Sequence, residues 1–199
     1  MKTIGITGGI GSGKSYVSAL LQREFGIPVY DCDKEAKRLT VESEGIRQKL
    51  IELVGPEVFD GETLNKQRLA DYLFSDPENA SRVNAIIHPA VLKDFRLWAE
   101  KQKPKKMVAL ESAILFESGF NAFVDNVLFV DAPEEVRLQR AMRRDSAKEE
   151  QIKARMKMQQ PEIHRAQADY IIRNFKADDT RLLEQLTNII HKLSCSKQS

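Results

Sequence analysis

The stretch that decides the fold lies close to the N-terminus and reads Gly8-Gly9-Ile10-Gly11-Ser12-Gly13-Lys14-Ser15. It fits G-x-x-x-x-G-K-[ST], a pattern whose glycines let consecutive backbone N–H groups point at phosphate oxygens. In such a loop the lysine reaches the β- and γ-phosphates and the hydroxyl residue is placed to bind Mg²⁺. The alternative is a glycine-rich turn with an incidental lysine, and the flanking segments decide between the two.

Both flanking segments have the character that a phosphate-binding loop requires. Residues 3–7 are apolar and rich in β-branched side chains, which predicts a buried strand. Residues 14–25 carry apolar side chains at helical spacing, so a helix begins at the loop and directs its positive end at the same anion. The sequence therefore predicts a nucleoside triphosphate site. Its predicted members are Gly8, Gly9, Gly11, Ser12, Gly13, Lys14 and Ser15.

Strand-like and helix-like segments alternate along the rest of the chain. Further strands are predicted over 27–30, 107–110, 127–130 and 170–172. Residues 34–103 have mostly helical patterns, with Pro89 expected at a helix start, and residues 178–193 predict a final amphipathic helix. This alternation predicts an α/β fold in which helices flank a parallel, doubly wound sheet of five strands.

Composition excludes several classes of protein. The chain has 199 residues and a formal net charge of +2, so it lacks the charge of a dedicated nucleic-acid binder. Its two cysteines, Cys32 and Cys195, have no metal-binding spacing and are expected to be free thiols. There is no signal-peptide pattern and no apolar run of the roughly 18 residues that a membrane helix needs. We expect a cytoplasmic protein without a membrane partner; its oligomeric state stays open.

The motifs that would mark a regulatory GTPase are missing. Asn65-Lys66-Gln67-Arg68 lacks the aspartate of a guanine-reading Asn-Lys-x-Asp, and Asp-x-x-Gly does not occur. The length and the missing motifs also speak against a transport ATPase or a helicase. A small-molecule kinase is therefore favoured, with a non-catalytic nucleotide-binding module as the alternative from another class.

Such a kinase needs a base for the acceptor and cations for the phosphoryl group. Asp31-Cys32-Asp33 follows the second predicted strand, at the edge where ligands of parallel sheets bind. Asp33 either serves the acceptor hydroxyl or caps a helix that starts at Lys34. Arg137, Arg140 and Arg144 share one helical face, which suits a charged phosphoryl group. The charged segment after them, 145–167, is expected to be a lid.

Taken together, the motifs resemble the dephospho-coenzyme A kinase family from Ile4 to about Leu186. The shared features are the following: Thr7 to Ser15; Asp31-Cys32-Asp33; Phe74-Ser75-Asp76-Pro77; Ile87-His88-Pro89; Leu115-Phe116-Glu117; Arg140, Arg144-Asp145, Arg155 and Gln159; Ala168 to Ile172 with Asn174. Differences from the family pattern include Tyr16, Lys66, Ala113 and Glu111.

The resemblance implies ATP and Mg²⁺ as cofactors and the ribose 3′-hydroxyl of dephospho-coenzyme A as acceptor. It implies Asp33 as the base, with Lys14, Arg140 and Arg144 acting on the phosphoryl group. Tyr16 and Asn174 join the nucleotide site, Ser15 is the metal ligand, and Asp31, Asp33 and His88 contact the substrate. It also implies a nucleotide-binding core (1–33, 104–144 and 168–199), a substrate-binding insertion (34–103) and a lid (145–167). Other nucleoside or nucleotide kinases stay open as the nearest alternative, and Glu111 raises the question of whether it helps to organise the metal.

Overall fold

A computed structural model describes residues 1–159, 161–175 and 179–195. The chain divides into two compact units, Met1–Val29 with Pro104–Ser199 and, second, Tyr30–Lys103. We call the first the sheet unit and the second the helical unit. The predicted helix over 178–193 is present as α9 (Asp179–Cys195), although residue 178 lies outside the described residues.

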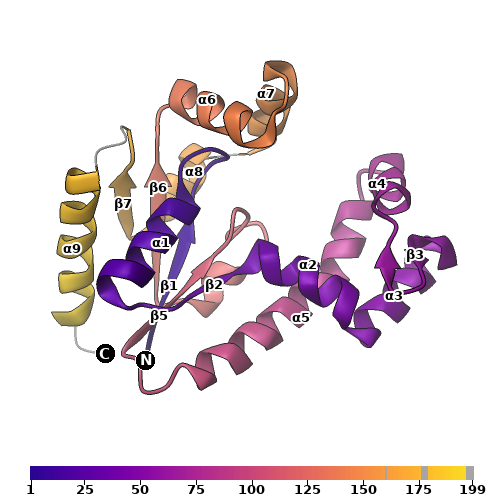
Figure 1. The fold of residues 1–199 in the computed structure, drawn as a ribbon, viewed down its shortest axis with the longest axis horizontal. Coiled ribbons are helices and arrows are strands. Elements are labelled where there is room, and N and C mark those ends of the chain that lie inside the picture. Colours follow the sequence, from indigo (N-terminus) through magenta and orange to yellow (C-terminus); the bar gives the residue numbers. More distant parts are fainter. Residues whose placement is uncertain (160, 176–178, 196–199) are drawn as a thin grey trace. The chain divides into compact units, whose positions relative to one another are not determined.

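The sheet has the strand order β2-β5-β1-β6-β7 (Figure 1). Its strands are β1 (Lys2–Thr7), β2 (Val29–Asp31), β5 (Met107–Glu111), β6 (Asn126–Asp131) and β7 (Tyr170–Arg173). β1 pairs in parallel with β5 and β6, and β6 pairs in parallel with β7. The five predicted strands and the parallel α/β fold are thus confirmed. Parallel strands require crossover connections, which explains why helical segments separate them in the sequence.

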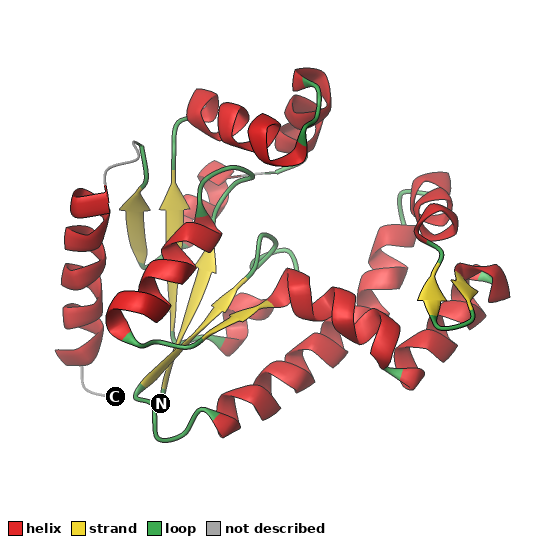
Figure 2. Cartoon of the chain, in the orientation of Figure 1, coloured by secondary structure: helices red, strands yellow, loops and turns green. Residues whose placement is uncertain are grey.

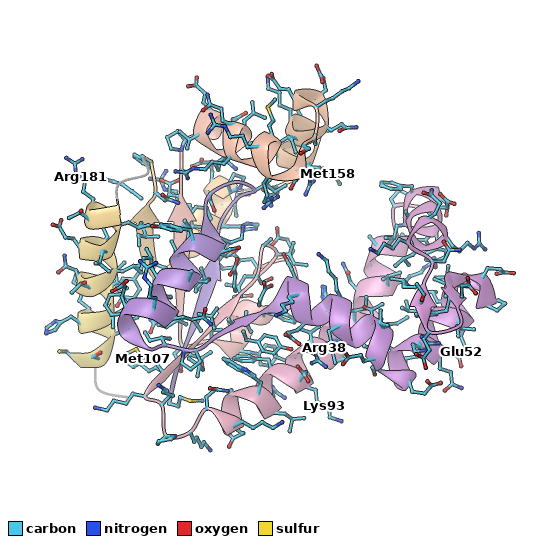
Figure 3. All side chains as sticks on the ribbon, in the orientation of Figure 1. Arg38, Glu52, Lys93, Met107, Met158 and Arg181 are labelled. Carbon is cyan, nitrogen blue, oxygen red and sulfur yellow. The ribbon has the colours of Figure 1, made fainter. Side chains whose placement is uncertain are left out.

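Alternation along the strands sorts side chains onto the two faces of the sheet. Ile4 and Ile6 of β1 point into the main core, where they meet α1 (Lys14–Phe25) and α9. Met107, labelled in Figure 3, opens β5 and belongs to the same core. On the opposite face Gly5 leaves room for Leu115, since a Cβ on this glycine would lie 2.8 Å from a Leu115 methyl carbon. Burial on both faces explains why the central residues of β1 and β5 are mostly apolar.

The connection from β6 to β7 is helical. It contains α6 (Glu134–Asp145), α7 (Glu149–Lys157) and α8 (Pro161–Gln167), and a 3₁₀ turn, Phe120–Phe123, precedes β6. α6 and α7 share a small core of Ala141, Ile152 and Met156, against which Ile10 of the phosphate loop packs. The predicted lid over 145–167 begins at the last residue of α6 and contains α7 and α8; its residue 160 lies outside the described residues. Its function as a lid stays a prediction.

The helical unit contains most of the expected helices and two short strands that were not predicted (Figure 2). Its elements are α2 (Cys32–Glu42), α3 (Glu44–Val54), a 3₁₀ turn (Pro56–Val58), β3 (Phe59–Asp60), β4 (Thr63–Leu64), α4 (Lys66–Ser75) and α5 (Asn79–Lys101). Ile46, Leu50 and Val83 lie at the centre of its core. A two-residue strand is too short for the period-2 pattern that identifies strands in a sequence.

The expectation that Pro89 starts a helix is wrong, because Pro89 lies inside the 23-residue helix α5. An interior proline removes one backbone hydrogen bond and costs about 3 kcal/mol. Buried side chains on both sides of it, Val83 before and Val91 and Phe95 after, hold α5 together across that position. Among the described helices, none combines the length and the apolar character that crossing a membrane requires.

Candidate active site

The phosphate loop takes a shape that only glycine allows at two of its positions. Gly13 caps α1 with φ 94°, and a Cβ there would lie 2.2 Å from Nδ2 of Asn174. Gly11 has φ 76°, and its Cβ would lie 2.1 Å from the carbonyl oxygen of Arg137 in α6. Left-handed backbone is unfavourable for other residues, and both contacts are closer than atoms can approach. The glycines are therefore required because Asn174, which follows β7, and Arg137 of α6 lie directly against the loop.

Lys14 is held by the loop that precedes it. Its Nζ donates to the carbonyl oxygen of Gly8 at 2.8 Å and to that of Gly9 at 3.3 Å. Lys14 is also the first residue of α1, whose N-terminal end carries a partial positive charge. An ammonium group and the start of a helix thus lie at the same loop, the arrangement that anions such as phosphate bind.

The Ser15 hydroxyl and the Glu111 carboxylate form a hydrogen-bonded pair. The Ser15 hydroxyl donates to Oε1 of Glu111 at 2.8 Å, and Glu111 ends β5 with 8% of its surface exposed. Mg²⁺ prefers oxygen ligands and keeps several waters, so one hydroxyl and one carboxylate suit it. Within the described residues there is no cluster of three or more histidine, cysteine, aspartate or glutamate side chains for a metal. These residues therefore fit a metal that shares its remaining ligands with phosphate and water.

Asn174 connects the loop to Arg140. Its Nδ2 donates to the carbonyl oxygen of Ser12 at 2.8 Å, and its own carbonyl oxygen accepts from Nη1 of Arg140 at 2.9 Å. Arg140 Nη1 also lies 3.4 Å from the Ser12 carbonyl oxygen, and burial lowers the pKa of this guanidinium. Residues that are 128 and 162 positions from Ser12 thus converge on one peptide group.

Arg144 has a different environment from Arg140. It donates two hydrogen bonds to Asp145, at 2.7 and 3.1 Å, and Asp145 also accepts from Arg155 at 2.8 Å. These hydrogen bonds from Arg144 and Arg155 lower the pKa of Asp145 to about 2. The side chain of Arg144 is 61% exposed. The structure thus places Arg140 at the loop and Arg144 in an exposed ion-pair network, and the catalytic roles of both stay predictions.

Two contacts at the loop were not anticipated from the sequence. Oε1 of Gln159 accepts the backbone N–H of Ile10 at 2.8 Å, so the end of the predicted lid segment touches the loop. The second contact is the hydrogen bond of Ser15 to Glu111. Both pairs are far apart in sequence, by 149 and 96 positions, and no local pattern indicates them. The family resemblance included Gln159 as part of the lid pattern, and it noted Glu111 as a difference from that pattern with a question about the metal, but it named no contact for either residue.

The predicted acceptor residues belong to the helical unit. Asp31 ends β2 and caps α2, because its side chain accepts the backbone N–H of Lys34 at 3.0 Å. The capping role considered for Asp33 therefore belongs to Asp31, and the helix starts at Cys32 rather than Lys34. Asp33 is exposed in the first turn of α2. His88 is half-buried in α5, and burial lowers its pKa. The substrate-binding roles of these residues stay predictions.

Tyr16 lies in the first turn of α1 and is 38% exposed. Its contact with the nucleotide stays a prediction. Ser12, by contrast, is fully buried, and its Oγ has no hydrogen-bond partner within the part of the chain that the structure describes. Buried hydroxyls nearly always have a partner, so an unpartnered one inside a phosphate loop fits a site that takes a polar ligand.

Comparison with known proteins agrees with this geometry. A family model described as dephospho-CoA kinase matches residues 2–179. A dephospho-CoA kinase of Bacteroides fragilis is 48% identical over 172 residues, covering 86% of this chain and 83% of the relative. One from Porphyromonas gingivalis is 46% identical over 192 residues, covering 96% and 93%. A crystal structure of a Thermus thermophilus protein, 34% identical, superimposes with a TM-score of 0.84 and covers 98% of both chains. The chain belongs to the dephospho-CoA kinase family, and it is a P-loop kinase in fold.

Proposed function

We propose that this chain transfers the γ-phosphate of ATP to the ribose 3′-hydroxyl of dephospho-coenzyme A, giving coenzyme A and ADP. In this reaction the 3′-oxygen forms a bond to the γ-phosphorus while the bond from that phosphorus to the β–γ bridging oxygen breaks. The observation that carries the proposal is Lys14 Nζ, fixed on the carbonyl oxygens of Gly8 and Gly9 at the start of α1. Family membership supports the choice of acceptor.

The nucleotide half of the proposal rests on the sheet unit. Backbone N–H groups of residues 8–15 and Lys14 hold the β- and γ-phosphates, and Tyr16 and Asn174 contribute to the nucleotide site. Arg140 and Arg144 stabilise the charge on the transferred phosphoryl group. Ser15, together with Glu111, would hold Mg²⁺, which when bound neutralises phosphate charge. The hydrogen bond of 2.8 Å between Ser15 and Glu111 supports this pairing.

The acceptor half rests on the helical unit. Asp33 receives the proton of the 3′-hydroxyl, while Asp31 and His88 contact the acceptor. Asp31 caps α2. Asp33 is the more exposed of the two carboxylates and is therefore the candidate for proton transfer. Asp33 also lies at the exposed start of that helix, where a substrate has access. The helical unit as a whole acts as the substrate-binding insertion, and α7 with α8 as the lid.

The test is a turnover assay with purified protein, Mg-ATP and dephospho-coenzyme A, beside a panel of nucleosides and nucleoside monophosphates. We expect rapid formation of coenzyme A and little product from the panel. If no coenzyme A forms while another acceptor is phosphorylated, that acceptor is the substrate and the proposed one is wrong. ATP binding without turnover of any acceptor would indicate a non-catalytic module.

The role of Asp33 is tested by Asp33→Asn. We expect kcat to fall by about 100-fold or more, as loss of a general base does, with ATP affinity nearly unchanged. Asp60→Asn, at an exposed position of the same unit, is the matched control. An equal loss of kcat and of ATP affinity in Asp33→Asn removes Asp33 from the proposed role.

A further inference from the structure

Arg137 is a buried cation beside the phosphate loop that the reaction scheme above does not use. It is 9% exposed, and its Nη1 has no hydrogen-bond partner among the described residues. A Cβ built on Gly9 would lie 2.1 Å from that same nitrogen. The guanidinium group therefore lies directly against the loop backbone, one helical turn before Arg140, the residue that bonds to Ser12 and Asn174.

No carboxylate forms an ion pair with Arg137 in the part of the chain that the structure describes. Arg137 lines a cavity of about 230 Å³ together with Gly9, Asp131, Glu134, Glu162 and Arg165. The Asp131 carboxylate is 3.5 Å from Nη2 of Arg165, and Glu162 is 3.8 Å from Nη1 of Arg165. The ion pairs between described residues thus engage Arg165 and leave Arg137 out. A buried guanidinium group with an unmet donor is unfavourable by itself.

The cost of this buried charge changes when a polyanion occupies the loop. A triphosphate held by the amides of residues 8–15 places several negative charges within a few ångströms of the Arg137 side chain. Arginine is the side chain that tolerates burial as a cation and that cannot lose its proton in response. Its charge then changes from a cost in the free protein to a favourable interaction in the complex.

We propose that Arg137 is a positioning residue that couples the phosphate loop to its ligand: it destabilises the empty loop and stabilises the loop that holds triphosphate. It acts through its charge, from a position against the backbone of Gly9, whose carbonyl oxygen accepts a hydrogen bond from Lys14. This inference rests on the proposed binding of ATP at residues 8–15. It requires no contact between Arg137 and the reacting atoms.

The coupling predicts two effects of opposite sign in Arg137→Met, which keeps a long side chain and removes the charge. The melting temperature of the nucleotide-free protein stays the same or rises. The affinity for Mg-ATP falls by at least about tenfold, because a unit charge within a few ångströms of the phosphates is lost. The KM for dephospho-coenzyme A stays unchanged. Arg137→Lys, which keeps the charge, restores most of the ATP affinity.

A purely structural role gives the reverse pattern in the same experiment. If Arg137 only packs α6 against the loop, Arg137→Met lowers the melting temperature of the free protein, and both KM values change together. That result overturns the proposal. Parent protein that does not bind Mg-ATP in the same titration points instead to failure of the proposed function, so the two failures are distinguishable.

Gly9→Ala supplies an independent measurement. A methyl group at Gly9 displaces the Arg137 guanidinium, which is the end of a flexible side chain. We expect Gly9→Ala to weaken ATP binding and the combination with Arg137→Met to add little further loss, because both changes remove the same interaction. Full additivity of the two losses contradicts the proposal.

Discussion

Replacing Asn174 with alanine tests the convergence of β7, α6 and the phosphate loop. The substitution removes the Nδ2 donor to the Ser12 carbonyl oxygen, at 2.8 Å, and the Oδ1 acceptor of Arg140 Nη2, at 3.4 Å. The backbone hydrogen bonds of residue 174, to Asp131 and from Arg140, do not depend on the side chain and persist. The change therefore acts on the loop carbonyl and leaves the strand end in place.

The size of the effect follows from burial. Asn174 is 6% exposed, so the Ser12 carbonyl oxygen cannot exchange the lost donor for water without rearrangement. Leaving a buried polar group without its partner costs about 1–3 kcal/mol. If this cost distorts the loop that binds phosphate, ATP affinity falls by roughly 5- to 150-fold. The weak remaining contact of Arg140 with the same carbonyl oxygen, at 3.4 Å, places the expected loss towards the lower end.

The assay is calorimetric titration with Mg-ATP, with the KM for ATP measured in parallel. Asn188→Ala, at an exposed position of α9, is the matched control and should bind as the parent does. Asn174→Asp removes the same donor and sets a carboxylate oxygen beside the Ser12 carbonyl, so it should lose at least as much affinity. Binding by Asn174→Ala within about twofold of the parent, well under the 1.4 kcal/mol of a tenfold change, refutes the reasoning.

Two further predictions concern residues of each unit. Glu111→Gln keeps an oxygen that accepts the hydrogen bond from Ser15 and removes the negative charge. We expect the variant to need about tenfold more Mg²⁺ for half-maximal activity, while its affinity for metal-free ATP stays unchanged. An unaltered Mg²⁺ requirement would exclude Glu111 from the metal site. Tyr30→Phe removes the hydrogen bond from the buried phenol to Asp94 Oδ2 at 2.7 Å, so the free energy of unfolding should fall by about 1 kcal/mol and ATP affinity should not change. Burial and Asp94 raise the pKa of Tyr30 in the folded protein. The phenol is therefore protonated in both the folded and the unfolded state below about pH 10, the pKa of an unfolded tyrosine. The difference in free energy of unfolding between parent and variant should be constant below that pH and shrink above it, as measured by urea titrations at several pH values.

Local patterns were sufficient wherever structure depends on near neighbours. The helix over 14–25 was predicted with both ends correct, because the loop before it and the glycine after it are signals within the segment itself. The five strands appear within one or two residues of their predicted positions. Strands buried on both faces are continuous apolar runs, which a sequence displays directly.

Local patterns failed where two effects compete within a few residues. Asp31 and Asp33 are both reasonable caps, and only the path of the chain leaving β2 selects Asp31. Proline is favoured at the first position of a helix, yet Pro89 lies inside α5, where side-chain packing before and after it outweighs the cost of the lost backbone hydrogen bond. The short pair of β3 and β4 has two residues in each strand, too few to show a period.

The phosphate loop could be predicted from the sequence, because glycines at fixed offsets, a lysine and the adjoining strand and helix are all contained in about 25 consecutive residues. The distant side chains that complete the loop become visible only in the folded chain. Glu111 reaches Ser15, Asn174 reaches Ser12, and Arg137 lies against Gly9. The physical reason is that the carboxyl ends of β5, β1, β6 and β7 meet at one edge of a parallel sheet, whatever their separation along the chain. The sequence cannot indicate that Nη1 of Arg137 is buried without a hydrogen-bond partner among the described residues, since this depends on which distant segments surround it.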